Sequence, residues 1–355
     1  MNTAKLTKNK GRNSTIETLK LILMYGVVIL HVCGANGRAI ELSGGGIDLQ
    51  LIRAFFICAV DSFIIISGYY LSSSNKRDIS KVINLYLVAA LFRVLLYSAG
   101  SIIKGTFTFS GFLGSLNVGN YFLLLYSAVY ILSPYINIVF NNITKKSFVQ
   151  LLTFMTILFS IYPTVIEYLF QRDETLMGYS FVSFFDGDGH GYTLVNFMFM
   201  YTIGAYLNKY GMIFNKKHYC FMIYSITSVL MAVVMHCVQK VELNYFSPIC
   251  IIAAVALFNY FALVKPSENK VVNYLSSTVF GIFIVHGLFI SLCDKIIKIE
   301  SIVNLSPMLR VGGILLFALS VFVLSILMSI VLNVIIDKIF MPCISRVKVL
   351  SYEVK

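Results

Sequence analysis

Ten apolar runs of roughly 20 residues divide this chain, and no other feature restricts its fold so strongly. A helix that crosses the hydrocarbon core of a bilayer needs about 20 mostly apolar residues. Short connections separate the runs, which cover 16–35, 48–71, 80–102, 118–140, 148–170, 191–210, 218–238, 245–264, 273–293 and 310–336. The sequence therefore predicts an all-α fold: a polytopic membrane helical bundle of about ten transmembrane helices.

The composition excludes the other broad classes of protein. Of the 355 residues, 58% are hydrophobic and only 12% are charged, whereas soluble proteins carry about 25% charged residues. A soluble globule cannot bury so much apolar surface, and a disordered chain is excluded by the same figures. Because no stretch is polar enough for a separate soluble domain, we expect one domain over 1–355, with tails at 1–15 and 337–355 around a bundle at 16–336.

The lysines and arginines predict how the bundle lies in the membrane. The net charge is +12; eighteen basic residues fall in the two tails and in every second loop, seven in the other loops and three within the runs. Positive residues favour the cytoplasmic side, so we expect both termini in the cytoplasm and the loop 171–190 outside. Since the charge is spread over short loops, the pattern favours membrane lipids as partners and does not indicate nucleic acid.

Three ionisable residues lie on one face of the first run. Lys20 and His31 are eleven residues apart, which places them within about 20° of the same helical face and about 16 Å apart along the axis. Glu17 precedes Lys20 by three residues and lies on nearly the same side. Ionisable groups at bilayer depth are costly, which favours a functional role. The structural alternative is a snorkelling lysine paired with a glutamate, plus a histidine bonded to the backbone.

Two more ionisable residues lie inside predicted helices. His286 lies about 13 residues into its run and His31 about 15, and both runs are expected to cross in the same direction. Each imidazole is then about 20 Å from the cytoplasmic surface, so the two are predicted to face one cavity; two unrelated hydrogen bonds are the alternative. Asp61 lies near mid-membrane, where a carboxylate must be paired, protonated or hydrated. Its expected partners are Lys20, Arg93 or an ion.

The longest outer loop, 171–190, interleaves aromatic rings with charged residues. Carboxylates of Asp186 and Asp188, His190 and the rings between them suit a sugar, because rings stack on its apolar face and carboxylates accept from its hydroxyls. An interfacial aromatic belt with solvated charges is the alternative. The seven cysteines form no C-x-x-C pair, so we interpret them as small buried hydrophobes and expect no metal site.

Five segments, in order along the chain, form a recognisable set. They are the frame of Glu17, Lys20 and His31; Phe63-Ile64-Ile65-Ile66-Ser67-Gly68-Tyr69-Tyr70-Leu71; Tyr121-Phe122 with Tyr126, Tyr130, Leu132-Ser133-Pro134 and Asn137; Tyr201-Thr202-Ile203-Gly204-Ala205-Tyr206; and Ser276-Ser277 with Gly281 and His286. This set resembles the acyltransferase 3 family of integral membrane acyltransferases, especially bacterial polysaccharide O-acetyltransferases. The chain departs from the family in having Lys20 for an arginine, Tyr121 for a tryptophan and Asp61 for an uncharged residue.

The resemblance implies a function and, with the residue pattern, a set of site residues. It implies transfer of an acyl group, acetyl from acetyl-CoA, to a hydroxyl of a cell-surface polysaccharide or its lipid-linked precursor, in the plasma membrane of a bacterial cell. A neutral imidazole can remove the hydroxyl proton, so His31 is the predicted base; Lys20 binds the donor or stabilises negative charge. The predicted catalytic set is His31, Lys20, Glu17 and His286; the predicted contacts to the donor phosphates are Lys76, Arg77 and Lys81; and the predicted substrate contacts are Asp61, Asp186, Asp188 and His190.

A different class of function remains open from the residues alone. In a transporter or a flippase of a glycan-related substrate, Asp61, Lys20 and His31 would form a coupling or substrate path through the membrane. The five segments in family order favour the enzyme.

Overall fold

The computed structural model describes residues 12–34, 36–169, 191–237, 244–336, 338 and 351–354, and most of them are helical. The elements are α1 (Ser14–Cys33), α2 (Ala39–Leu42), α3 (Ile47–Phe56), α4 (Ala59–Leu71), β1 (Lys76–Asp78), α5 (Ile79–Lys104), α6 (Phe109–Ser115), α7 (Tyr121–Asn142), α8 (Lys145–Thr156), η1 (Ile157–Ile161), α9 (Tyr162–Leu169), α11 (Leu194–Tyr210), α12 (Lys217–Cys237), α13 (Pro248–Ala262), α14 (Lys270–Ser276), α15 (Val279–Ile296), α16 (Ile299–Val303), α17 (Pro307–Ile335) and β2 (Ser351–Glu353).

Each of the ten predicted runs falls on a helical segment of the structure. Within the described residues, eight segments are long and apolar enough to cross a membrane. The other two runs correspond to shorter helices, α11 with 17 residues and α13 with 15. The predicted all-α polytopic bundle is therefore confirmed.

Two of the predicted spans are interrupted rather than continuous. The run predicted at 48–71 is divided into α3 and α4 by a turn at Ile57 and Cys58, and the run at 273–293 into α14 and α15 by a turn at Ser277 and Thr278. At the second turn, the hydroxyls of Ser277 and Thr278 donate to the carbonyls of Tyr274 and Leu275. Such local bonds compete with the helical ladder, which is why the helix restarts in a new direction.

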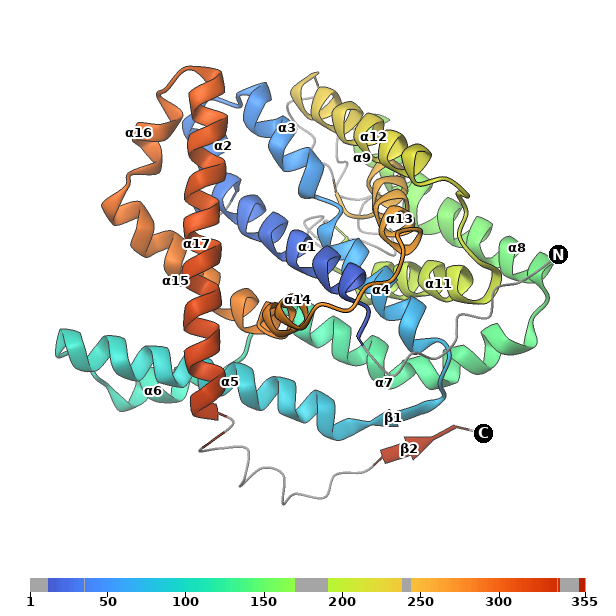
Figure 1. Cartoon of the computed structure of the whole chain (residues 1–355), viewed down its shortest axis with the longest axis horizontal. Coiled ribbons are helices and arrows are strands. Elements are labelled where there is room, and N and C mark those ends of the chain that lie inside the picture. Colours follow the sequence, from blue (N-terminus) through green and yellow to red (C-terminus); the bar gives the residue numbers. More distant parts are fainter. Residues whose placement is uncertain are drawn as a thin grey trace.

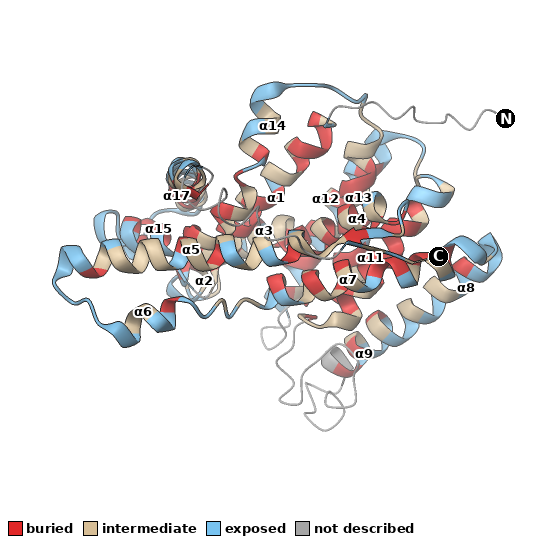
Figure 2. Ribbon diagram, turned by 90° about the horizontal axis from the view of Figure 1, so that it is seen from below, coloured by how far each residue is buried: buried red, intermediate tan, exposed pale blue. Residues whose placement is uncertain are grey.

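Helix α1 lies in the middle of the bundle and touches α3, α4, α13, α14, α15 and α17 (Figure 1). Figure 2 shows that buried residues concentrate on α1, α4, α11 and α13. In the most apolar stretch of α1, 61% of residues are buried, against 17% for α5 and for the segment that begins with α8. The inner helices are thus packed by protein, and the outer ones present apolar side chains such as Ile103 and Phe154 to lipid.

Helices α4 and α11 approach each other closely at two glycines. A Cβ at Gly68 would lie 2.2 Å from the carbonyl oxygen of Tyr201, and a Cβ at Gly204 would lie 2.2 Å from that of Ile65. Membrane helices approach closely where small residues face each other, because lipid supplies no hydrophobic drive to hold them together. Both glycines belong to the family-like segments found in the sequence.

We predict that Gly204→Ala lowers the thermal unfolding temperature in detergent, since the added methyl group must push α4 and α11 apart. Overpacking of this kind costs about 1–3 kcal/mol. Gly312→Ala is the matched control, because a Cβ at Gly312 on α17 meets nothing within 4 Å. Equal unfolding temperatures for the two variants would contradict this packing.

Candidate functional site

A cavity of about 1810 Å³ runs alongside α1 from one end of the helix to the other. Arg12, Glu17, Lys20 and Ser276 line it at the amino end of α1, and His31 and His286 line it at the carboxyl end. We call these regions the amino end and the carboxyl end of the cavity. Pockets for one small ligand are commonly about 300–1,000 Å³, so this cavity is larger than one small ligand requires.

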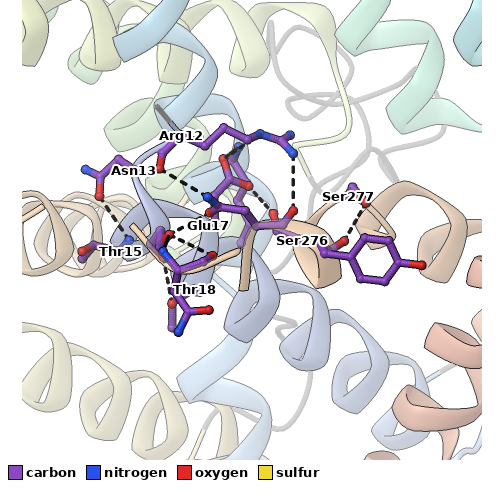
Figure 3. A network of polar contacts seen from close by, with 12 residues as sticks. Arg12, Asn13, Thr15, Glu17, Thr18, Ser276 and Ser277 are labelled. Carbon is purple, nitrogen blue, oxygen red and sulfur yellow. Dashed lines mark hydrogen bonds and ion pairs between the residues drawn. The ribbon is translucent and has the colours of Figure 1, made fainter. Parts of the chain in front are cut away.

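Glu17 fastens α1 to α14 at the amino end (Figure 3). Its carboxylate accepts a hydrogen bond from Ser276 Oγ, lies 2.9 Å from Lys20 Nζ and lies 3.8 Å from Arg12 Nε. Figure 3 shows the contacts around Glu17, which join the first turn of α1 to the end of α14. A buried carboxylate needs such partners to offset its loss of water. Glu17 is therefore an anchor between helices, whereas Lys20 stays partly exposed to the cavity.

The two predicted histidines meet at the carboxyl end of the cavity. The ring centroids of His31 and His286 are 4.7 Å apart. His286 Nδ1 lies 3.1 Å from the carbonyl oxygen of Ile282, one turn earlier on α15, and His31 Nδ1 lies 2.8 Å from Asn36 Oδ1. A carbonyl oxygen can only accept, so His286 Nδ1 carries the proton and its Nε2 keeps a lone pair in the neutral ring.

The structure separates the predicted catalytic set into two groups. Glu17 and Lys20 lie at one end of the cavity, and His31 and His286 at the other. The eleven residues from Lys20 to His31 on the unbroken helix α1 correspond to about 16 Å. Lys20 and His31 therefore lie too far apart to contact the same atoms, and both predicted roles of Lys20 stay predictions.

Asp61 does not line the cavity, and its described contacts include neither Lys20 nor Arg93. It is only 1% exposed on α4. Asn196 Nδ2 on α11 donates to Oδ1 at 3.4 Å, and Cys250 Sγ on α13 lies 3.6 Å from Oδ2. Arg93 instead donates to the carbonyl of Ser115. Asp61 thus joins three packed helices, and the prediction that it contacts substrate is not supported by its position.

Arg77 is the clearest departure from the predicted donor site. It is 3% exposed, with Nε 2.8 Å from Ser133 Oγ and the other guanidinium nitrogens within 2.9 Å of the carbonyls of Leu71, Ser74 and Lys76. These donors are committed to the protein, so the position of Arg77 does not favour the predicted phosphate contact, which stays a prediction. Lys76 and Lys81 are exposed but do not line the cavity.

Helix α7 and the last described strand build the surroundings of Arg77. Pro134 cannot donate to the carbonyl of Tyr130 in the preceding turn, and Ser133 Oγ donates to that carbonyl at 2.8 Å instead. Strand β2 pairs antiparallel with β1, with Arg77 opposite Tyr352. The Tyr352 hydroxyl donates to the carbonyl of Ile131 on α7. The connection after α4 is therefore fixed from both sides.

Outside the membrane helices, Asp78 caps α5. Its carboxylate accepts from the hydroxyl and the backbone N–H of Ser80, and these bonds lower the pKa of Asp78 below its ordinary value. Asp186, Asp188 and His190 lie outside the described residues, as does the rest of 171–190, so the sugar-binding prediction stays a prediction. Within the described ranges, no three His, Cys, Asp or Glu side chains gather closely enough to hold a metal ion.

Sequence reasoning missed several residues that line the cavity. Arg12 contributes to the sequence analysis only as one charge of the amino-terminal tail. Its position eight residues before Lys20 is a signal that could have placed it near the same end of the first helix. Tyr121, Tyr192 and Tyr245 form an aromatic cluster: the first two ring centroids are 4.3 Å apart and the last two 4.8 Å, with a 3.1 Å bond between the hydroxyls of Tyr192 and Tyr245. No local pattern brings these three segments together.

We predict that Arg77→Met destabilises the protein, because Ser133 Oγ and the carbonyl of Lys76 lose their described donor. The carbonyls of Leu71 and Ser74 keep Asn137 Nδ2 as a donor. Each unsatisfied buried group costs about 1–3 kcal/mol. Lys76→Met and Lys81→Met serve as controls, since exposed substitutions usually stay within about 0.5 kcal/mol. Thermal unfolding followed by fluorescence checks this. A wild-type unfolding temperature for Arg77→Met, with reduced acetyl-CoA binding, would restore Arg77 as a donor contact.

The sequence also matches a known protein family. The profile described as an acyltransferase domain, that of acyltransferase 3, matches residues 13–334. No curated protein and no solved structure matches the chain. The matched region contains all of α1 to α16, almost all of α17 and both histidines of the cavity. The chain therefore belongs to the acyltransferase 3 family.

Proposed function

We propose that this membrane acyltransferase moves an acetyl group from acetyl-CoA to a hydroxyl of a cell-surface polysaccharide or of its lipid-linked precursor. The single observation that carries the proposal is the cavity, which joins a cationic amino end to a carboxyl end with two adjacent imidazoles. With both termini in the cytoplasm, as the loop charges predict, the amino end faces the cytoplasmic pool of acetyl-CoA and the carboxyl end faces the outer surface.

At the amino end, Arg12 and Lys20 provide positive charge for the phosphates of CoA. Both line the cavity, and both lie within 4 Å of Glu17, which holds them in place. Charge-assisted bonds from cations to phosphate are about twice as strong as neutral ones. The acyl thioester then extends along α1 toward the histidines.

At the carboxyl end, His31 acts as the general base. Its Nε2 takes the proton of the acceptor hydroxyl while the oxygen attacks the thioester carbonyl. The tetrahedral intermediate collapses with cleavage of the carbon–sulfur bond, and His31 returns the proton to the departing thiolate of CoA. No proton is gained or lost overall. His286, whose ring lies beside His31, offers a lone pair on Nε2 that accepts from a different hydroxyl of the sugar and so orients the acceptor.

The aromatic cluster supports a sugar as the acceptor. Tyr121, Tyr192 and Tyr245 line the same cavity as the histidines, together with Asn120 and Asn244. Ring contacts continue from His286 through Phe283 to Phe122, the neighbour of Tyr121. Tyrosine combines an apolar face with a polar tip, and amides both donate and accept. This combination suits a sugar ring, whose faces are apolar and whose edge carries hydroxyls.

We predict that His31→Ala lowers acetyl transfer by about 10²–10⁴-fold, the usual effect of losing a general base, while acetyl-CoA still binds. His236→Ala is the control, because His236 is exposed on α12. The measurement is acetylation of surface glycan in cells that lack the gene and carry each variant at equal protein level. Transfer by His31→Ala within a few-fold of wild type would exclude His31 as the base.

We predict that Lys20→Met and Arg12→Met raise the KM for acetyl-CoA and change kcat less, because both residues lie far from the histidines. A charge-assisted bond is worth about 1.5–3 kcal/mol, which corresponds to a KM rise of roughly 10-fold or more where the contact is well shielded. Lys81→Met is the matched control, since Lys81 is exposed and away from the cavity. An effect confined to Lys81→Met would place the donor elsewhere.

Acetyl-CoA labelled in its acetyl group separates the enzyme from the transporter. The proposed transferase moves the label to glycan and leaves free CoA. A transporter or flippase leaves the label on acetyl-CoA in sealed vesicles and moves glycan-related substrate across them instead. Label transfer in vesicles that contain the wild-type protein, and not in those with His31→Ala, supports the enzyme.

A further inference from the structure

The chain turns back on itself directly after α1 and returns Asn36 to the last turn of the helix. The backbone N–H of Gly34 donates to the carbonyl of Leu30, and those of Asn36 and Gly37 both donate to the carbonyl of His31. A Cβ at Gly37 would lie 2.2 Å from the carbonyl oxygen of Val32. Only glycine fits there, so this tight turn requires a glycine at position 37.

This turn determines what the imidazole of His31 contacts. Asn36 Oδ1 lies 2.8 Å from His31 Nδ1. An amide oxygen only accepts, so Nδ1 must donate its proton to it. A neutral imidazole has a single N–H, and the hydrogen bond of one nitrogen decides which nitrogen carries it. The lone pair therefore stays on Nε2, the nitrogen that the proposed base needs.

The Asn36 amide is also held from the side of α15. A Cβ at Gly287 would lie 3.4 Å from Asn36 Nδ2, so the amide packs over a residue of α15 that has no side chain, next to His286. His286 Nδ1 donates to the Ile282 carbonyl of its own helix, and any helix provides such an acceptor one turn earlier. His31 instead relies on a side chain from the turn, and this makes Asn36 a specific requirement.

We propose that Asn36 is the positioning residue of His31: it fixes the Nδ1–H tautomer and keeps Nε2 available as the base. The inference rests on the proposed function for its catalytic consequence, while the tautomer itself is a property of the site. An asparagine holds the ring through a neutral acceptor and adds no charge beside it. The charged or titratable groups at this end of the cavity are His286, Arg38, Glu41 and Arg53.

Nitrogen-15 NMR of histidine-labelled protein in lipid bilayers measures the tautomer directly. The chain has five histidines, and the signal of His31 is the one that His31→Ala removes. We expect a protonated Nδ1 and a bare Nε2 in the wild type at neutral pH. Asn36→Ala should lose this preference, whereas Asn36→Asp, which keeps the acceptor, should retain it. Asn304→Ala, in the exposed turn after α16, is the control and should leave the signal unchanged.

Kinetics with acetyl-CoA give the second readout. Loss of a residue that orients a functional imidazole commonly costs about 10–100-fold. We expect this loss in kcat for Asn36→Ala, with the KM for acetyl-CoA nearly unchanged, and partial recovery of kcat in Asn36→Asp. A change in KM alone would indicate a merely structural or binding effect and would overturn the proposal.

The two experiments separate the inference from the function on which it rests. An unchanged His31 tautomer in Asn36→Ala overturns the role of Asn36, whatever the transferase activity. A tautomer that depends on Asn36 in a protein without acetyl transfer supports the positioning contact and contradicts the proposed function. A shifted tautomer together with reduced kcat supports both.

Discussion

The attachment of α1 to α14 through Glu17 is the interaction on which the arrangement of the site depends. Glu17 binds Ser276 immediately before the turn that starts α15. Because α1 and α15 run from this contact in the same direction, His31 and His286 lie side by side, with ring centroids 4.7 Å apart. A buried carboxylate without a partner is costly, so the contact sets the relative register of the two helices. The same carboxylate holds Lys20 and Arg12 at the cavity wall. One polar group thus organises both ends of the site.

Under the proposed function, the cavity would bring together substrates from the two sides of the membrane. Arg12 and Lys20 at the amino end would hold the phosphates of the donor, and the tyrosine cluster at the carboxyl end would offer the sugar apolar faces and hydrogen-bonding groups. Polar side chains at bilayer depth are tolerated only where they are buried in protein or line a cavity. The ionisable residues of α1 satisfy this condition, whereas the peripheral helix α5 presents mainly apolar side chains outward.

The sequence was sufficient for the features that follow from local pattern. Apolar runs predicted the helices, and counting residues along two parallel runs placed His31 and His286 at the same depth. It was insufficient where distant segments meet. The burial of Arg77 depends on Ser133 and on strand β2, more than 200 residues further along the chain. The tyrosine cluster joins α7 to the segments before α11 and α13. Asn36 could not be predicted from helical spacing, because the turn after α1 brings it back to His31. The predicted domain limits and the loop 171–190 remain predictions.

The central claim is that a single cavity along α1 holds the donor at one end and the reacting atoms at the other. Cryo-electron microscopy of the protein in lipid nanodiscs with CoA bound tests it most directly. The account predicts density for the nucleotide phosphates beside Arg12 and Lys20, with the pantetheine arm following α1 and its sulfur close to His31 and His286. Density for CoA at Lys76 and Lys81, away from the cavity, with the cavity free of ligand, would contradict it.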